Sequence, residues 1–192
     1  MLVPIERLLG MPILSLQTGA ELAHADGVII DPRQLKVVAL RVAGSLLDHN
    51  DSVLHPEDIR EISDLGFIID SSDKLMSTDG LVRLQQVIDF GFSLNGTRVE
   101  DEQGRKVGSV KSYAVDPNSF FVQQLYIKPP LMRSIGLTML TIHRSQIISI
   151  TNEKIVVKSP TVQKKVKSVE NDQPAFVNPF RAPAPPLEGR RN

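Results

Sequence analysis

The sequence predicts an all-β protein of two small β-barrels in tandem, with a short connecting helix and a disordered C-terminal tail. Three observations predict this organisation: an internal repeat, short β-rich runs between polar turns, and a change in composition after Val157. The 192 residues, 41% of them hydrophobic, suffice for one ordinary domain or two small ones. We expect a first barrel at residues 1–76, a linker with a helix at 77–92, a second barrel at 93–158 and a tail at 159–192.

The internal repeat relates residues 19–42 to residues 104–127 at a constant offset of 85. Five positions are identical in the two copies: Gly19, Asp31, Pro32, Val37 and Leu40 recur as Gly104, Asp116, Pro117, Val122 and Leu125. They fall on turn residues and on alternating apolar positions, where backbone geometry is most demanding. Residues 58–67 match residues 146–155 at an offset of 88, so the second copy has three more residues in its middle connection.

Each copy contains a predicted hairpin around an Asp-Pro turn. The runs 37–42 and 120–127 are rich in β-branched and aromatic residues, and each follows an apolar strand that ends at Asp31-Pro32 or Asp116-Pro117. The aspartate can accept backbone N–H bonds, and proline presets φ for the turn. Gly19 and Gly104 suit an earlier hairpin turn, because glycine adopts positive φ without a steric cost.

Further short strands are expected downstream in each copy. Single turns at 55–58 and 143–146 lead into strands at 59–62 and 147–151, and strands at 66–69 and 154–157 end the copies. Five or six short strands in each half favour a closed barrel over an open sheet, because closure removes exposed edges.

Between the copies, residues 81–88 have the apolar spacing of a two-turn helix. Thr78 or Asp79 is the expected N-cap. Since such a short helix is marginal alone, we expect it to pack on a barrel.

The tail at 159–192 differs in charge and composition from the rest. It has six basic and three acidic residues, a net of +3, so the remaining 16 basic and 19 acidic residues leave −3 on the body. Six of the thirteen prolines lie there, which disfavours a core or a sheet. Two interpretations stay open: a solvated tether, or a segment that binds a partner through Lys164, Lys165, Lys167, Phe176 and Phe180.

The usual signatures of enzymes are missing. The absence of cysteine excludes disulfides, thiolate metal sites and a cysteine nucleophile. His24, His49, His55 and His143 do not have metal-ligand spacing, and no phosphate-binding or nucleophile motif occurs. The segment 70–73 has the pattern of an Asx-type turn rather than a cation loop. We therefore predict no catalytic, cofactor-binding or metal-binding residue. A hydrolase or metal enzyme stays open as an alternative function, behind the two given below.

The sequence also bears on location and on nucleic acid. Glu6 and Arg7 interrupt the apolar N-terminal stretch, and no run reaches the ~18 apolar residues of a membrane span, so we expect a cytoplasmic protein. Zero net charge excludes a uniformly basic nucleic-acid binder. A local RNA contact stays open through Lys158, the tail lysines and three aromatic residues that could stack on bases or fill the core: Phe120, Phe121 and Tyr126.

The pattern Gly104-x-x-Val-Gly-Ser-Val…Asp116-Pro117, an apolar strand and the turn Ile142-His-Arg-Ser-Gln-Ile147 resembles the PRC-barrel family. This family includes the β-barrel of the photosynthetic reaction centre H subunit and the C-terminal half of a ribosome maturation factor. The resemblance covers about residues 5–158 in two copies and is clearer in the second, because Ala23 replaces the second glycine of the motif in the first.

The family has no common catalytic residues. The resemblance therefore implies a non-enzymatic adaptor or scaffold that binds a protein partner through barrel surfaces and the tail. The alternative is a ribosome- or RNA-associated maturation factor.

Overall fold

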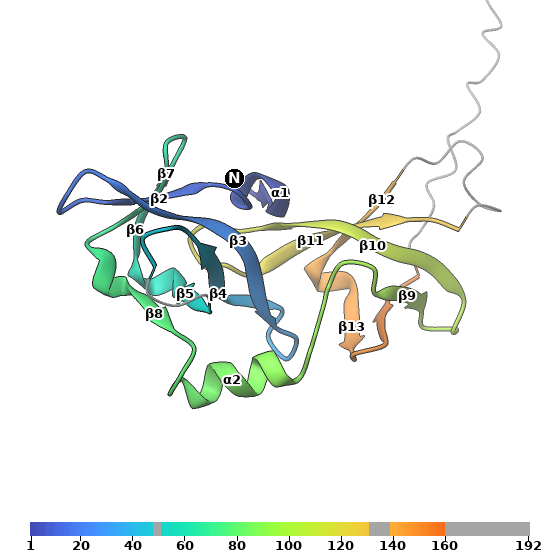
Figure 1. The fold of residues 1–192 in the computed structure, drawn as a ribbon. Helices are drawn as coiled ribbons and strands as arrows, with labels where there is room; N and C mark the ends of the chain where they lie inside the picture. Colours follow the sequence, from blue (N-terminus) through green and yellow to red (C-terminus); the bar gives the residue numbers. More distant parts are fainter. Residues whose placement is uncertain (48–50, 131–138, 160–192) are drawn as a thin grey trace, which may run out of the picture. The chain divides into compact units, whose positions relative to one another are not determined.

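The described part of the chain consists mainly of β-strands (Figure 1). The computed structural model describes residues 1–47, 51–130 and 139–159. The elements there are β1 (Val3–Pro4), α1 (Ile5–Leu8), β2 (Pro12–Ser15), β3 (Glu21–Asp31), β4 (Lys36–Ala43), β5 (Ser52–Leu54), η1 (Pro56–Asp58), β6 (Ile59–Ser63), β7 (Gly66–Ile69), η2 (Ser72–Lys74), β8 (Leu75–Ser77), α2 (Val82–Asp89), β9 (Arg98–Asp101), β10 (Lys106–Val115), β11 (Val122–Lys128), β12 (Leu140–His143), η4 (Arg144–Gln146), β13 (Ile147–Ile150) and β14 (Lys154–Val157). None of the helices in these ranges is both long enough and apolar enough to cross a lipid bilayer.

The strands form two seven-stranded sheets, in agreement with the all-β prediction. The first has the order β6-β7-β2-β3-β4-β5-β8, and the second has β12-β11-β10-β9-β14-β13 with β1 beside β10. β1 lies in the half predicted as the first barrel but belongs to the second sheet. On β10, the pairing with β9 is limited to the N-terminal part, Lys106–Ser109. β1 pairs with β10 farther along, at Ala114 and Val115. The N-terminal strand thus supplies backbone partners at a position that β9 does not reach.

The two sheets contain equivalent pairings. β2 runs parallel to β7 with Ile13 opposite Phe67, and β9 runs parallel to β14 with Val99 opposite Ile155. These positions are related by offsets of 86 and 88; the second equals the repeat offset of residues 58–67, and the first differs by one residue from the offset of 85 that begins at Gly19. The hairpins β6–β7 and β13–β14 contain the strands predicted at 66–69 and 154–157. The first copy does not end there, because β8, which the sequence did not predict, follows β7 and pairs with β5 at the edge of the first sheet.

The predicted turn residues have the expected local geometry. Gly19 and Gly104 adopt φ values of +69° and +75° in the β2–β3 and β9–β10 turns. Asp31 accepts a hydrogen bond from the Arg33 N–H at 2.9 Å, and Asp116 accepts one from the Asn118 N–H at 3.2 Å. Both Asp-Pro turns therefore join the strands of a hairpin, β3–β4 and β10–β11.

The first copy accommodates Ala23 by a change across the sheet. Gly108, at the corresponding position of the second copy, has φ of +159°, and a Cβ there would lie 2.2 Å from the Lys128 carbonyl oxygen. In the first copy the glycine is Gly44, where a Cβ would lie 2.9 Å from the Ala23 Cα. Close approach of the two strands needs one residue without a side chain, and each copy places that glycine on a different strand.

One hydrophobic cluster draws on both sheets. The predicted core positions Val37, Leu40, Val122 and Leu125 are fully buried in it. Burial of each large aliphatic side chain contributes roughly 1.5–3 kcal/mol to the free energy of unfolding, so the repeated strands supply much of the stability.

A smaller cluster attaches α2 to the first sheet. Leu84 of the helix packs against Ile29, Ala39 and Val53, on the face of β3–β4–β5 opposite the main core. The helix was predicted at 81–88 and forms at 82–89 (Figure 1). The predicted side-chain cap was wrong: Leu81 is the N-cap residue and gives no side-chain hydrogen bond.

The Thr78 hydroxyl, one of the two expected caps, instead donates to the Asp51 carboxylate at 2.7 Å. The helix begins at Val82, one residue later than predicted, and is held mainly by its buried face.

Candidate functional site

A cleft of about 630 Å³ lies where the β3–β4 turn, η1 and α2 meet. Its lining residues are Asp31, Pro32, Arg33, Gln34, Lys36, Val37, Val38, His55, Pro56, Glu57, Arg83, Leu84, Gln86, Val87 and Phe90. This volume falls within the range of about 300–1,000 Å³ typical of ligand-binding pockets. The cleft thus brings together the first repeated turn, the turn before β6 and the connecting helix.

Cationic side chains predominate in the cleft. Arg33, Lys36 and Arg83 line it, and within the described residues none of the three has an ion pair with a carboxylate. Of the two acidic residues there, Asp31 already accepts the Arg33 N–H, which leaves Glu57 as an exposed carboxylate at the wall. The three cations outnumber the two carboxylates by one, so the cleft lining has a formal net charge of +1.

Part of the cleft lining is apolar. Val37 and Leu84 are buried, Val87 is half-buried, and Phe90 at the end of α2 is 48% exposed. An exposed aromatic residue beside cations offers one apolar anchor and several charged contacts to an incoming chain. Such a surface suits a peptide with acidic and apolar side chains.

The cleft borders a junction between the two sheets. Leu35 and Phe120, which are equivalent in the repeat, are buried and have φ values of +48° and +58°. The Val37 N–H donates to the Phe120 carbonyl oxygen and the Val122 N–H donates to the Leu35 carbonyl oxygen, each at 2.9 Å. These reciprocal bonds join equivalent groups, as in a two-fold interface.

Arg144 of η4 reinforces this junction. Its guanidinium donates to the carbonyl oxygens of Gln34, Leu35 and Val122 at 2.6, 3.1 and 3.2 Å. It also lies 4.8 Å from the centroid of the Phe121 ring. Since Gln34 lines the cleft, Arg144 fixes one cleft wall to the second sheet.

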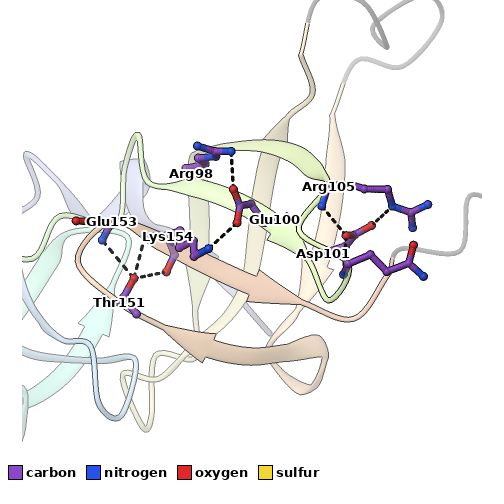
Figure 2. A network of polar contacts seen from close by, with 8 residues as sticks. Arg98, Glu100, Asp101, Arg105, Thr151, Glu153 and Lys154 are labelled. Carbon is purple, nitrogen blue, oxygen red and sulfur yellow. Dashed lines mark hydrogen bonds and ion pairs between the residues drawn. The ribbon is translucent and has the colours of Figure 1, made fainter.

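A second polar network holds β9 beside β14 (Figure 2). Glu100 is 5% exposed and pairs with Lys154 Nζ at 2.8 Å and with Arg98 at 2.5 Å. The hydrogen bond from Lys154 is the main cause that holds the pKa of Glu100 below its ordinary value, and it outweighs the opposing effect of burial.

The neighbouring Asp101 is equally buried. Burial would raise its pKa, but hydrogen bonds from the backbone and side chain of Arg105 and the backbone of Gln103 lower it overall. Both carboxylates are therefore charged and hydrogen-bonded near neutral pH, which suits strand pairing and turn formation better than proton transfer.

The histidine and acidic-turn predictions had different outcomes. His143 makes the predicted local hydrogen bond, with Nδ1 at 2.9 Å from the Ser145 hydroxyl. His55 occupies the equivalent turn but its side chain gives no cap. In the 70–73 segment, Asp70 pairs with Arg60 in place of the predicted Asx contact. No group of three or more potential metal-binding side chains occurs within residues 1–47, 51–130 and 139–159.

The aromatic residues considered for base stacking are largely occupied by protein contacts. Phe120 is 4% exposed and belongs to the core, as the strand alternation allows. Phe121 has Lys36 5.6 Å and Arg144 4.8 Å from its ring centroid. The half-buried Tyr126 donates its hydroxyl proton to Gln124 at 3.3 Å.

The predicted tail from residue 160 lies outside the described residues. So do the predicted partner-binding residues in it: Lys164, Lys165, Lys167, Phe176 and Phe180.

The sequence analysis did not single out the cleft residues Arg33, Lys36, Arg83 and Phe90. Arg33 and Lys36 flank a turn that was identified, so their exposure was predictable. Their approach to Arg83 depends on the docking of α2 and has no local signal in the sequence.

A scan against protein-family models finds no match for this chain, and a search of curated proteins finds no similar sequence.

Proposed function

We propose that this protein is a cytoplasmic, non-enzymatic adaptor that binds an acidic polypeptide segment with apolar residues in the cleft beside α2. The observation that carries the proposal is the grouping of Arg33, Lys36 and Arg83, without acidic partners among the described residues, around an apolar wall that ends at Phe90. Complementary charge would steer and orient the partner, and burial of its apolar side chains would supply affinity.

We further propose that the two sheets are tandem barrels of the PRC type. The equivalent parallel pairs β2–β7 and β9–β14 support this interpretation, as do the equivalent Asp-Pro hairpins. The predicted tail would provide a second contact with the same partner through its lysines and phenylalanines. Adaptors of this kind position a partner without altering it chemically.

A peptide-binding assay tests the cleft directly. Fluorescent peptides that combine Glu or Asp with Leu and Phe are titrated with the full chain, and binding is followed by fluorescence anisotropy. Matched peptides replace the acidic residues by Lys or the apolar residues by Ser. We expect at least one acidic, apolar peptide to bind and both kinds of replacement to weaken it.

Charge-reversal variants locate the contact. Arg83→Glu and Arg33→Glu should each weaken the peptide by about tenfold, since each changes an attraction of about 0.5–1 kcal/mol into a repulsion of similar size. Lys111→Glu is the matched control, because Lys111 is exposed on β10 and does not line the cleft. Equal effects of all three variants would contradict a cleft contact.

The RNA-associated alternative gives a different result in the same assay. A single-stranded RNA oligonucleotide would bind with an affinity that falls steeply as salt increases, because bound counterions are released from its phosphates. Tight RNA binding together with no peptide binding would overturn the adaptor proposal in favour of that alternative.

A further inference from the structure

A second cavity, of about 340 Å³, also borders α2, and Val87 lines both this cavity and the peptide cleft. Its lining comes from α1, β3, β4, β10 and the segment from α2 to β9. Most of the lining side chains are apolar, among them Ile5, Val28, Ile88 and Phe92. At about 30 Å³ for each water-sized group, the cavity has room for on the order of ten such groups. This is the lower end of the size range of small-molecule sites.

Tyr113 brings a phenol hydroxyl to this cavity. The side chain is 3% exposed and lines the cavity from β10. Within the described residues its hydroxyl has no hydrogen-bond partner. Burial, assisted by the negative charge of Glu6, raises the pKa of Tyr113 well above its ordinary value, so the phenol stays protonated. The hydroxyl is therefore a donor without a protein acceptor among the described residues, and it is open to an acceptor in the cavity.

The exposed side chain of Arg41 brings a positive charge to the same cavity from β4. Its stem lies across Gly27, where an added Cβ would be 3.7 Å from the Arg41 Cβ and Cδ. Among the described residues the guanidinium has no ion pair and no hydrogen bond. An arginine side chain stays charged at any physiological pH. An anionic group in the cavity would give this charge a partner.

We propose that the cavity binds a small apolar carboxylate, with its carboxylate paired to Arg41 and an uncharged acceptor on its apolar body hydrogen-bonded to Tyr113. The carboxylate lies at Arg41 because Glu6 would repel an anion beside Tyr113. Ile5, Val28, Ile88 and Phe92 contact the hydrocarbon part of the ligand. The linings of this site and of the peptide cleft share Val87 alone, and the site does not depend on the adaptor function.

Calorimetric titration of the full chain with three probes tests the site. Octanoate combines an apolar chain with a carboxylate, octanol lacks the charge, and acetate lacks the apolar chain. We expect octanoate to bind at least about tenfold more tightly than either control, because only octanoate satisfies both the charge and the apolar walls. No heat of binding for octanoate, or equal binding of octanoate and octanol, would overturn the proposal and identify a water-filled cavity.

Two variants assign the contacts. Arg41→Gln keeps a long polar side chain and should weaken octanoate by about tenfold, whereas Arg33→Gln, in the peptide cleft, should leave it unchanged. Medium-chain acids of several lengths with a hydroxyl on the terminal carbon should include one that binds about fivefold more tightly than its unsubstituted parent.

Tyr113→Phe should abolish that gain and leave the affinity for octanoate unchanged. An unchanged affinity in Arg41→Gln, or a hydroxyl gain that persists in Tyr113→Phe, would overturn the assigned contacts. Circular dichroism spectra of each variant establish that it is folded. Since Arg41 and Tyr113 do not line the peptide cleft, peptide binding measured on Arg41→Gln and Tyr113→Phe separates failure of this site from failure of the adaptor proposal.

Discussion

Arg144→Ala should destabilise the junction between the two sheets. The Arg144 side chain is partly buried and spans backbone carbonyl groups of both halves of the repeat. The substitution removes all three of its hydrogen bonds and its contact with Phe121 together. The Leu35 and Val122 carbonyl groups would retain only their backbone partners or solvent.

The expected size of the effect follows from these contacts. The two partly buried hydrogen bonds contribute about 1 kcal/mol each and the exposed one about half as much. The contact with the Phe121 ring adds roughly 0.5 kcal/mol at a site of this exposure. The free energy of unfolding should therefore fall by about 3 kcal/mol. Arg144→Lys should lose about half as much, because lysine keeps the charge but lacks the planar fork that reaches several carbonyl oxygens.

Urea denaturation followed by circular dichroism measures the loss. The control is Arg7→Ala, which removes an arginine 65% exposed from its pair with Asp64 and should cost at most about 0.5 kcal/mol. A double-mutant cycle with Phe121→Leu isolates the ring contact, with an expected coupling of about 0.5 kcal/mol. If Arg144→Ala costs no more than Arg7→Ala, the argument that this side chain joins the sheets is wrong.

Three further predictions concern the backbone, the acidic network and the helix. Gly66→Ala should lower the free energy of unfolding, measured in urea, by more than about 2 kcal/mol, because the new Cβ would lie 2.3 Å from the Pro12 carbonyl oxygen at a φ of +144°. Gly19→Ala is the control: a Cβ there would have open space, and the substitution should cost about 1 kcal/mol. Since the pKa of Glu100 is lowered in the folded state, its stabilising effect is present above its ordinary value of 4.5 and lost as pH falls through the folded value. Glu100→Gln should accordingly flatten the acid limb of a stability–pH profile, and an unchanged profile would contradict this role. Leu84→Ala should cost about 2–4 kcal/mol and detach α2 from the sheet, and thermal melts with peptide titrations would reveal both effects.

Local sequence patterns were sufficient to predict the strands and turns. The Asp-Pro turns and the glycines at positive φ express short-range steric rules that act within a few residues. Val37 and Leu40 are three residues apart, and both reach the core at an irregularity in the β3–β4 register, which strand alternation alone does not predict. The helix at 82–89 was predictable for the same reason, because its apolar spacing is local. Its N-cap was not, since Thr78 bonds to a residue far away in the sequence.

Tertiary structure decided how these elements combine and where a site forms. Three features join residues about 80 to 110 positions apart: the pairing of β1 with β10, the reciprocal backbone bonds of Val37 with Phe120 and of Val122 with Leu35, and the hydrogen bonds from Arg144 to Gln34 and Leu35. The grouping of Arg33 with Arg83, and of Arg41 with Tyr113, likewise depends on how the helices and sheets pack. Local propensities fix which residues extend or turn, whereas only long-range packing fixes which charges share a cavity.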